Sequence, residues 1–330
     1  MERLIDFSRD RHMLCGSCGQ RFLVDLDWIH RWEQGQEKCP GCALTCEHED
    51  APRVIVDPAD PALDDDLVAR LSWYHTSTHP NWPPKNFDPA ASLTAETRQL
   101  MGGDRQVADW ATRQKRKALH VGTYEAAIHN MLRRIDDQAD HGSQFYLYRV
   151  RLEPTVTVRT DWIIDPSNFV GDVMLDEVCP PGIDVVRYLN YHEDPGGISL
   201  ALGKDAIAGV QRVAIPLADT WDESWVRNAV AALKNATANV APATGKLSRF
   251  RRPSSPRVVA SHEPEALREL CADLARRLPA NLQNQFTSAT AFAEGDHPVR
   301  WARRTSGLFK LIEDPGRVLA TLDTADRRNV

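Results

Sequence analysis

Four cysteines near the N-terminus have the spacing of a metal site. Cys15 and Cys18 form one C-x-x-C pair, and Cys39 and Cys42 form a second pair after an interval of twenty residues. Two such pairs can surround one ion with four thiolates, which is the closed tetrahedral shell of structural zinc. Residues 1–50 are therefore predicted to form a four-cysteine zinc-ribbon module. Cys46 and His48 follow closely as alternative ligands, although the four cysteines already complete a shell.

Other residues able to do chemistry lie in three short segments of the central region. They are Trp73–Thr78, Leu119–Ile128 and Tyr188–Ser199. Taken singly, these segments are ordinary. A histidine at the end of an apolar strand is more often structural than catalytic, and Glu-Asp-Pro-Gly-Gly is the composition of a turn.

The order and spacing of the three segments resemble those of ADP-ribosyltransferases, in particular the diphtheria-toxin/PARP-like branch and the small rifampin-modifying enzymes. In that family a first strand carries a histidine, a second strand leads into a helix with an Ala-Ala pair, and a late acidic residue precedes a further strand. The similar elements here are Tyr74–Thr78, Leu119–Ile128 and the acidic residue before Ile198–Leu202, which could be Glu193 or Asp194. The likeness covers residues 71–202. It departs from the family at Thr76, where glycine is usual, and at His120, where tyrosine is usual.

The resemblance implies that NAD is the substrate and that ADP-ribose passes to a macromolecular acceptor, either protein or nucleic acid. Loss of nicotinamide leaves an oxocarbenium-like ribose, which a carboxylate can stabilise. A histidine can contact a ribose hydroxyl, and an aromatic or imidazole ring can stack on nicotinamide. The implied catalytic residues are Glu193, His75 and His120, and the implied NAD contacts are His75, Thr76, His120, Tyr124 and Asn190, the last by orienting Glu193.

Two other hypotheses fit the same residues. One is a non-catalytic zinc-ribbon protein that binds nucleic acid or a protein partner, for which the basic clusters Arg113–Lys117, Arg133–Arg134 and Lys246–Arg257 are candidates, although such runs are commonly solvated surface. The other is a nuclease or glycosidase that uses His75, His120 and Glu193 as acid, base and orienting group. The usual Rossmann, P-loop, zinc-protease and nucleophile-elbow motifs are absent from the sequence.

The chain as a whole has the composition of an α+β protein with two or three domains. It has 330 residues and a net charge of -6, which argues against general nucleic-acid binding. It lacks an apolar run long enough for a membrane helix or a signal peptide, so no membrane partner and a cytoplasmic location are expected. We expect a linker at 51–66, an ADP-ribosyltransferase-like mixed β core with helices at 67–217, and a mainly helical accessory domain at 218–330. Periodicity predicts strands at Leu71–His75, Ala118–Val121, Phe145–Leu152, Val156–Arg159 and Ile198–Leu202, and helices at Tyr124–Ile135, Glu223–Ala236, Glu265–Arg277 and His297–Phe309.

Overall fold

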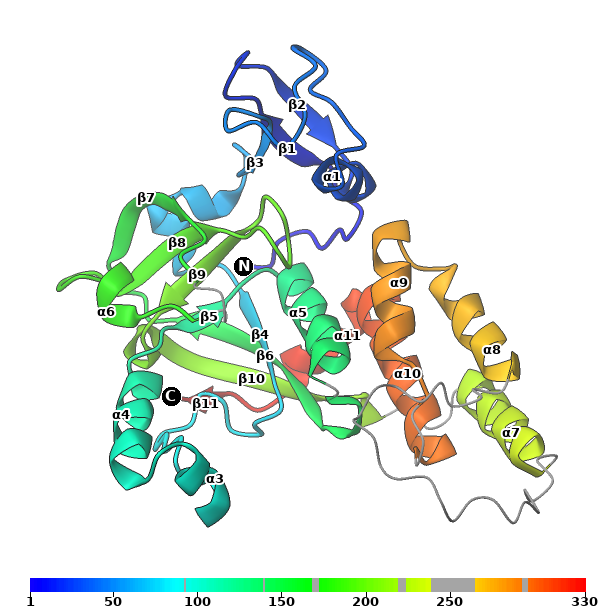
Figure 1. Ribbon diagram of the computed structural model, residues 1–330. Helices are drawn as coiled ribbons and strands as arrows, with labels where there is room; N and C mark the ends of the chain where they lie inside the picture. The colour runs from blue at the N-terminus through cyan, green and yellow to red at the C-terminus, as the bar shows by residue number, and fades with distance from the viewer. Residues whose placement is uncertain (92, 139, 168–171, 219–223, 239–264, 293–295) are drawn as a thin grey trace. The chain divides into compact units, whose positions relative to one another are not determined.

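The computed structural model describes the chain apart from residues 92, 139, 168–171, 219–223, 239–264 and 293–295 (Figure 1). The described residues form a mixed α/β fold with a four-cysteine cluster near the N-terminus, as predicted. The chain divides into two compact units. The first contains Met1–Met131, Tyr146–Val213 and Thr321–Val330, and the second contains Leu132–Phe145 and Ala214–Ala320. The predicted basic loop at Lys246–Arg257 lies outside the described residues.

The first unit begins with a small three-stranded module. Strand β1 (Arg11–Leu14) lies between β2 (Arg21–Val24) and β3 (Arg53–Ile55) and is antiparallel to both. Helix α1 (Leu26–Glu33) is capped at its N-terminus by Asp25, whose side chain accepts a hydrogen bond from the backbone N–H of Trp28 at 2.6 Å. The buried core of the module is Met13, Val24, Leu26, Ile29, Trp32, Ala51 and Val54.

Residues 51–66, expected to be a linker, contain ordered elements. They hold β3 and the short helices η1 (Pro61–Leu63) and α2 (Asp65–Val68). Asp60 and Asp64 cap these two helices by accepting N–H bonds at 2.8 Å and 2.9 Å. Asp and Pro favour loops and helix starts alike, so composition does not separate the two structures.

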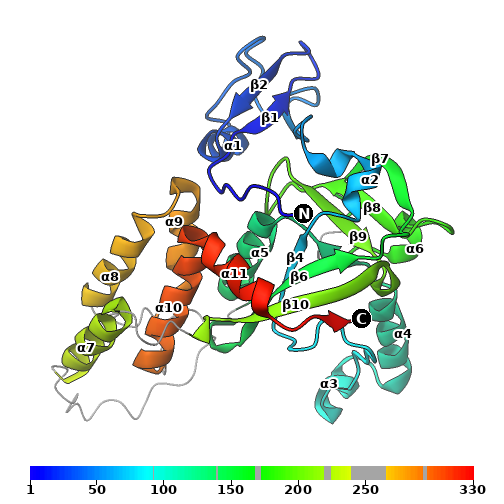
Figure 2. The same ribbon diagram turned by 180° about the vertical axis from the view of Figure 1, so that it is seen from behind.

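Two four-stranded sheets form the body of the first unit. One has the order β11-β10-β6-β4, in which β11, the last strand of the chain, lies beside β10 (Figure 2). The other has the order β5-β9-β8-β7, in which β7 and β8 are parallel and the other pairs are antiparallel. The strand bounds are β4 (Trp73–Ser77), β5 (Leu119–Val121), β6 (Phe145–Leu152), β7 (Val158–Ile164), β8 (Val185–Leu189), β9 (Ile198–Leu202), β10 (Ile207–Ile215) and β11 (Arg328–Asn329).

The edge strands β4 and β5 connect the two sheets. Tyr74 and Gly122 exchange backbone hydrogen bonds of 2.9 Å and 3.0 Å, which form an antiparallel bridge. A Cβ on Gly122 would approach the Ser199 hydroxyl oxygen to 2.9 Å, so the absence of a side chain permits this close junction. The bridge brings the first two sequence segments of interest together.

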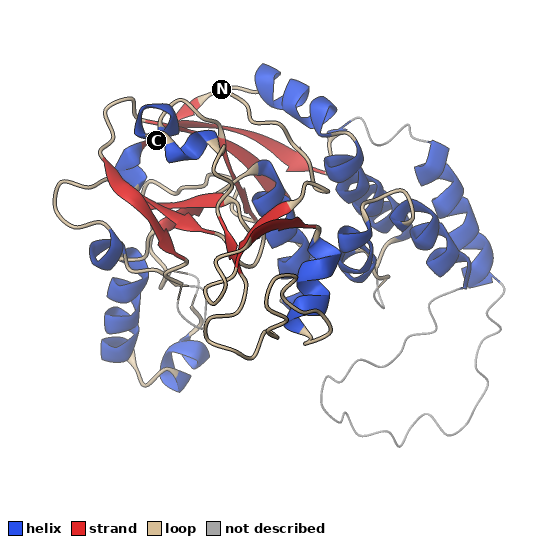
Figure 3. Cartoon of the chain, turned by 90° about the horizontal axis from the view of Figure 1, so that it is seen from above, coloured by secondary structure: helices blue, strands red, loops and turns tan. Residues whose placement is uncertain are grey.

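Helices complete both units, and the second unit is mainly helical (Figure 3). Its core includes Val226, Leu233, Leu267 and Trp301. No helix of the described residues is both long and apolar enough to cross a membrane. The remaining helices are α3 (Ala95–Leu100), α4 (Asp104–Lys115), α5 (Tyr124–Asp137), η2 (Asp140–Gly142), α6 (Leu175–Val178), η3 (Lys204–Ala206), α7 (Ser224–Ala238), α8 (Glu265–Ala275), α9 (Ala280–Ala289), α10 (Pro298–Glu313) and α11 (Pro315–Thr324).

Candidate active site and metal centre

The four predicted cysteines form a cluster that can hold a metal ion such as zinc. Their sulfur atoms all lie within 4.8 Å of one another. The Cys15–Cys42 and Cys18–Cys39 sulfur pairs are each 3.7 Å apart. A regular tetrahedron with Zn–S bonds of about 2.3 Å has edges of about 3.8 Å, so the donors fit a zinc ion. These separations are also too long for disulfides, whose sulfurs lie about 2 Å apart.

The two cysteine turns are built for thiolate ligands. Burial raises the pKa of the Cys39 thiol, but backbone N–H groups of Cys42 and Gly41 outweigh it and bring that pKa to about 7. A Cβ on Gly41 would collide with the Gln20 side chain and come within 3.0 Å of the Cys18 sulfur. Among the described residues, Cys46 and His48 do not belong to the cluster.

His75 lies on β4, and its ring is held from two directions. Its Nδ1 is 2.9 Å from the carbonyl oxygen of His120. Because a carbonyl only accepts, Nδ1 of His75 carries a proton. Trp82 stacks on the imidazole with ring centroids 4.0 Å apart and planes inclined by 17°. The tautomer and the orientation of His75 are therefore both fixed by its neighbours.

His120 lies on β5 at the end of a chain of side-chain hydrogen bonds. Its Nδ1 accepts a hydrogen bond, whereas the Nδ1 of His75 donates one. The Asn190 amide donates to the Ser199 hydroxyl at 3.0 Å, Ser199 bonds to Tyr188, and the Tyr188 hydroxyl is 2.9 Å from His120 Nδ1. Burial and the charges of Asp165 and Glu193 raise the pKa of Tyr188, so it keeps its proton and donates it to Nδ1. His120 thus carries its own proton on Nε2.

The charge state of His120 follows from its surroundings. Burial lowers the pKa of the imidazole, and the carboxylates of Asp165, Glu193 and Asp172 oppose that effect without reversing it. His120 is therefore neutral at pH 7.

Glu193 lies in the turn between β8 and β9. The side-chain oxygen of Asn190 accepts the backbone N–H groups of His192, Glu193 and Asp194 at 3.1, 2.9 and 3.1 Å. The Asn130 amide of α5 donates to the Glu193 carboxylate at 3.3 Å. The Glu193 charge opposes the lowering of the His120 pKa by burial. Of the three predicted catalytic residues, the structure joins His75 to the backbone of His120, and it joins Glu193 to Asn130 of α5. Asn190 orders the Glu193 turn through its side chain, without a helix.

Thr76 and Tyr124, the other expected NAD contacts, are buried on the helix side of β4. The Thr76 hydroxyl donates to the carbonyl oxygen of Ala127 at 3.1 Å. The Tyr124 ring packs edge-on against Tyr74 and Phe7, with centroids 5.3 Å and 6.2 Å apart. Both side chains are therefore engaged within the core, and Thr76 and Tyr124 are only 1% and 2% exposed.

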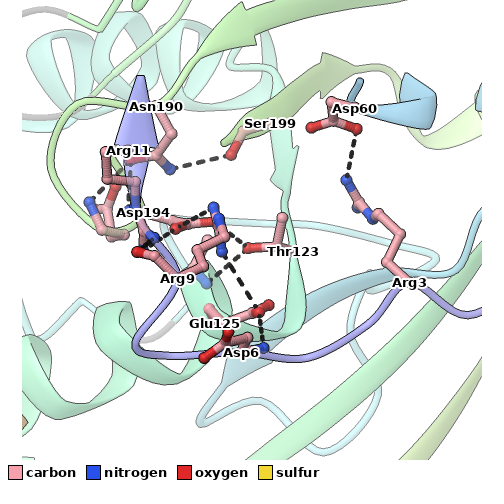
Figure 4. Close-up of polar contacts among 12 residues, drawn as sticks. Arg3, Asp6, Arg9, Arg11, Asp60, Thr123, Glu125, Asn190, Asp194 and Ser199 are labelled. Carbon is pink, nitrogen blue, oxygen red and sulfur yellow. Dashed lines mark hydrogen bonds and ion pairs between the residues drawn. The ribbon is translucent and has the colours of Figure 1, made fainter. Parts of the chain in front are cut away.

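A buried network of charges beside Glu193 was missed by the sequence reasoning (Figure 4). Asp194 is 1% exposed. Its Oδ1 lies 2.6 Å from Arg9 and 3.1 Å from Arg11, and its Oδ2 accepts the Thr123 hydroxyl at 2.8 Å. Arg9 also lies 3.5 Å from Glu125, whose carboxylate accepts the backbone N–H of Asp6. No periodicity signals contacts between residues so distant in sequence.

The network contains two arginines and two acids, and the pKa values of the two acids shift in opposite directions. Burial raises the pKa of Asp194, but the charges of Arg9 and Arg11 outweigh it and hold that pKa below its usual range. Burial, and then the neighbouring Asp194 charge, raise the pKa of Glu125. Of the two acids, Asp194 is therefore the one that carries the charge on which the arginines depend.

Comparisons with protein-family models, with curated proteins and with solved structures found no match to this chain.

Proposed function

We propose that the protein cleaves NAD and transfers ADP-ribose to a macromolecular acceptor, with Glu193 as the catalytic carboxylate. The observation that carries the proposal is the contact of His75 with the backbone of His120 beside the β4–β5 bridge, with the charge of Glu193 acting on His120 from the β8–β9 turn. These are the three residues that the family resemblance assigns to catalysis, and they come from segments far apart in the sequence. The β4–β5 bridge joins the two strands that carry the histidines.

The reaction needs few groups from the protein. The bond between the ribose C1 and the nicotinamide nitrogen breaks, and its electron pair leaves with nicotinamide, which becomes a neutral pyridine. The ribose carries the positive charge, and an acceptor N–H or O–H attacks it and loses a proton. A carboxylate held beside the ribose stabilises that charge most strongly in the transition state. Glu193, oriented by Asn130, is assigned this role.

The two histidines are assigned different contacts with the substrate. His75, whose Nδ1 is held by the His120 carbonyl, is assigned to a ribose hydroxyl, and His120, whose Nδ1 is held by Tyr188, is assigned to a hydroxyl or the carboxamide oxygen. Since Tyr124 packs against Tyr74 and Phe7, the nicotinamide contact is assigned to His120.

The four-cysteine cluster is assigned one zinc ion with a structural role. Four thiolates leave no open coordination position for a water or a substrate, so the ion takes no part in the chemistry at Glu193. Its contribution is to stabilise the N-terminal module, whose hydrophobic core is small.

Nicotinamide release, measured by mass spectrometry, tests the proposal. The purified chain would be incubated with NAD and a cell lysate, beside a Glu193→Gln variant and an exposed control, Glu177→Gln. We expect release by the wild type and the control, and at least a hundredfold less by Glu193→Gln, since positioned electrostatic groups are typically worth about 10²–10³ in rate. NAD labelled in its adenosine half would then mark the acceptor as protein or nucleic acid.

The alternatives give different results. Absence of release from every form, together with absence of NAD binding by calorimetry, would reject the transferase and favour a zinc-ribbon protein that binds a partner. NAD-independent cleavage of nucleic acid or a glycoside that depends on the same three residues would instead favour a hydrolase.

A further inference from the structure

The turn that carries Glu193 is held against the N-terminal module by three separate contacts. Gly196, at φ +87°, brings the turn so close to β3 that a Cβ there would lie 3.3 Å from the carbonyl oxygen of Ile55 and 3.5 Å from the Arg11 side chain. Tyr191 packs against the hydrophobic core of the module and also against the core of the body. Asp194 receives the arginine pair.

The arginine pair is continuous with the metal centre along the chain. Arg11 is the first residue of β1, and this strand ends at Leu14, directly before the first cysteine of the cluster. Strand β3, which Gly196 contacts, pairs with β1 residue for residue, from His12↔Ile55 to Leu14↔Arg53. One small sheet therefore joins the cysteine cluster to the surface that holds the turn.

From the body of the first unit, the turn is held by the Asn190 side chain, by the Asn130 bond to Glu193 and by the Thr123 hydroxyl, which donates to Asp194 at 2.8 Å. Asp194 is buried, so its charge depends on the arginines for compensation. Small zinc modules commonly keep their structure only while their metal is bound, and this module of about fifty residues has a small core. Loss of the metal would therefore release both the apolar and the ionic contacts at once.

We infer that the four-cysteine module is a positioning element for Glu193, which acts through Arg9, Arg11 and Asp194 so that metal occupancy controls the order of the 190–197 turn. The inference rests on the proposed function for its catalytic meaning. The coupling itself is a physical property that can be measured without any activity.

Hydrogen exchange with mass spectrometry on the full chain tests the coupling. The zinc-loaded protein would be compared with protein stripped by a chelator, and Cys39→Ser with the non-ligand control Cys46→Ser. We expect amides of 190–197 to exchange at least about tenfold faster in the stripped protein and in Cys39→Ser. The β6 peptide, 145–152, and the Cys46→Ser variant should stay at the zinc-loaded level. Faster exchange in 1–56 with an unchanged turn would overturn the inference.

If metal loss opens the whole first unit, a second variant tests the coupling with the metal still bound. Arg9→Gln, examined with its metal bound, removes the stronger ion pair while the module stays folded; Arg9→Lys keeps the charge. Selective loosening of 190–197 in Arg9→Gln, with partial recovery in Arg9→Lys, supports the inference, and equal protection in all three proteins refutes it.

Kinetics separate this inference from the proposed function. If nicotinamide is released, Arg9→Gln should lower kcat at least about tenfold and change KM little, because a misplaced carboxylate affects the transition state more than binding. A matched fall in kcat with KM raised to the same extent would refute a positioning role. Absence of release by every form would reject the transferase, while the exchange data would still decide the coupling.

Discussion

Asp194→Asn is the substitution whose cost can be worked out most directly from the structure. Asp194 is 1% exposed, and both arginines contact its Oδ1. Asparagine keeps the shape and one acceptor oxygen but leaves Arg11, itself 2% exposed, without a full counter-charge. Removal of one partner of a buried pair typically costs about 3–5 kcal/mol. Because Arg9 is partly exposed and can regain water, we expect the lower end, about 3 kcal/mol.

Urea denaturation of the full chain measures this cost. The transition of the first unit can be followed by pulsed hydrogen exchange of the β6 peptide. With a slope of about 2 kcal/mol per molar urea, its midpoint should fall by about 1.5 M. The exposed control Asp205→Asn should change the free energy of unfolding by less than about 0.5 kcal/mol.

The pH dependence of the free energy of unfolding is an independent test of the role of Asp194. The pKa of Asp194 is lowered in the folded chain. Its stabilisation is therefore present above the unfolded value of about 4 and disappears as the pH falls through the folded value. The wild type and Asp194→Asn should differ at pH 7 and approach each other below about pH 4. A difference under about 0.5 kcal/mol at pH 7 would refute the assignment of Asp194 as the charge that holds the arginines.

Three further predictions concern other parts of the molecule. Glu125→Gln should cost less than Asp194→Asn in the same urea assay, about 1 kcal/mol, because burial and the Asp194 charge raise the pKa of Glu125 and so disfavour its charge in the folded chain. A cost equal to that of Asp194→Asn would contradict this difference between the two acids. The chain should release about one zinc per molecule to a chelator, measured by elemental mass spectrometry, and Cys39→Ser should lose this zinc while Cys46→Ser keeps it, as a four-thiolate shell requires. Gly307→Ala should destabilise the second unit by about 1–3 kcal/mol in thermal unfolding, because its Cβ would collide with Pro216, whereas Gly316→Ala, which meets nothing closer than 3.7 Å, should be neutral or stabilising.

Local pattern predicted much of the secondary structure. The strand expected at Phe145–Leu152 is β6 with the same bounds, the strand expected at Ile198–Leu202 is β9, and the helix expected from Tyr124 is α5. Apolar runs that are buried throughout leave a clear signal. Strand β7 starts and ends later than the expected Val156–Arg159 because it is a half-exposed edge strand with a mixed pattern.

The candidate site could be predicted only in part. The four cysteines were visible because their ligands come in two local pairs. His75, His120 and Glu193 were singled out by resemblance, and the contact of His75 with the His120 backbone depends on the β4–β5 bridge, which no local pattern encodes. The Arg9–Asp194 pair lies 185 residues apart in sequence, and neither residue differs in type or spacing from a solvated surface charge.

The first unit can complete its sheet only at the end of translation, because its last strand comes from the C-terminal residues. Strand β11 completes the sheet beside β10, and the Gln211 side chain on β10 donates to the carbonyl oxygens of Leu322 and Ala325 at 2.9 Å and 3.1 Å. A nascent chain that has not yet reached residue 329 therefore leaves one edge of β10 unpaired and Gln211 without these acceptors. Residues 214–320 of the second unit are translated between β10 and β11. The ribosome therefore completes the second unit before the first unit can add its last strand.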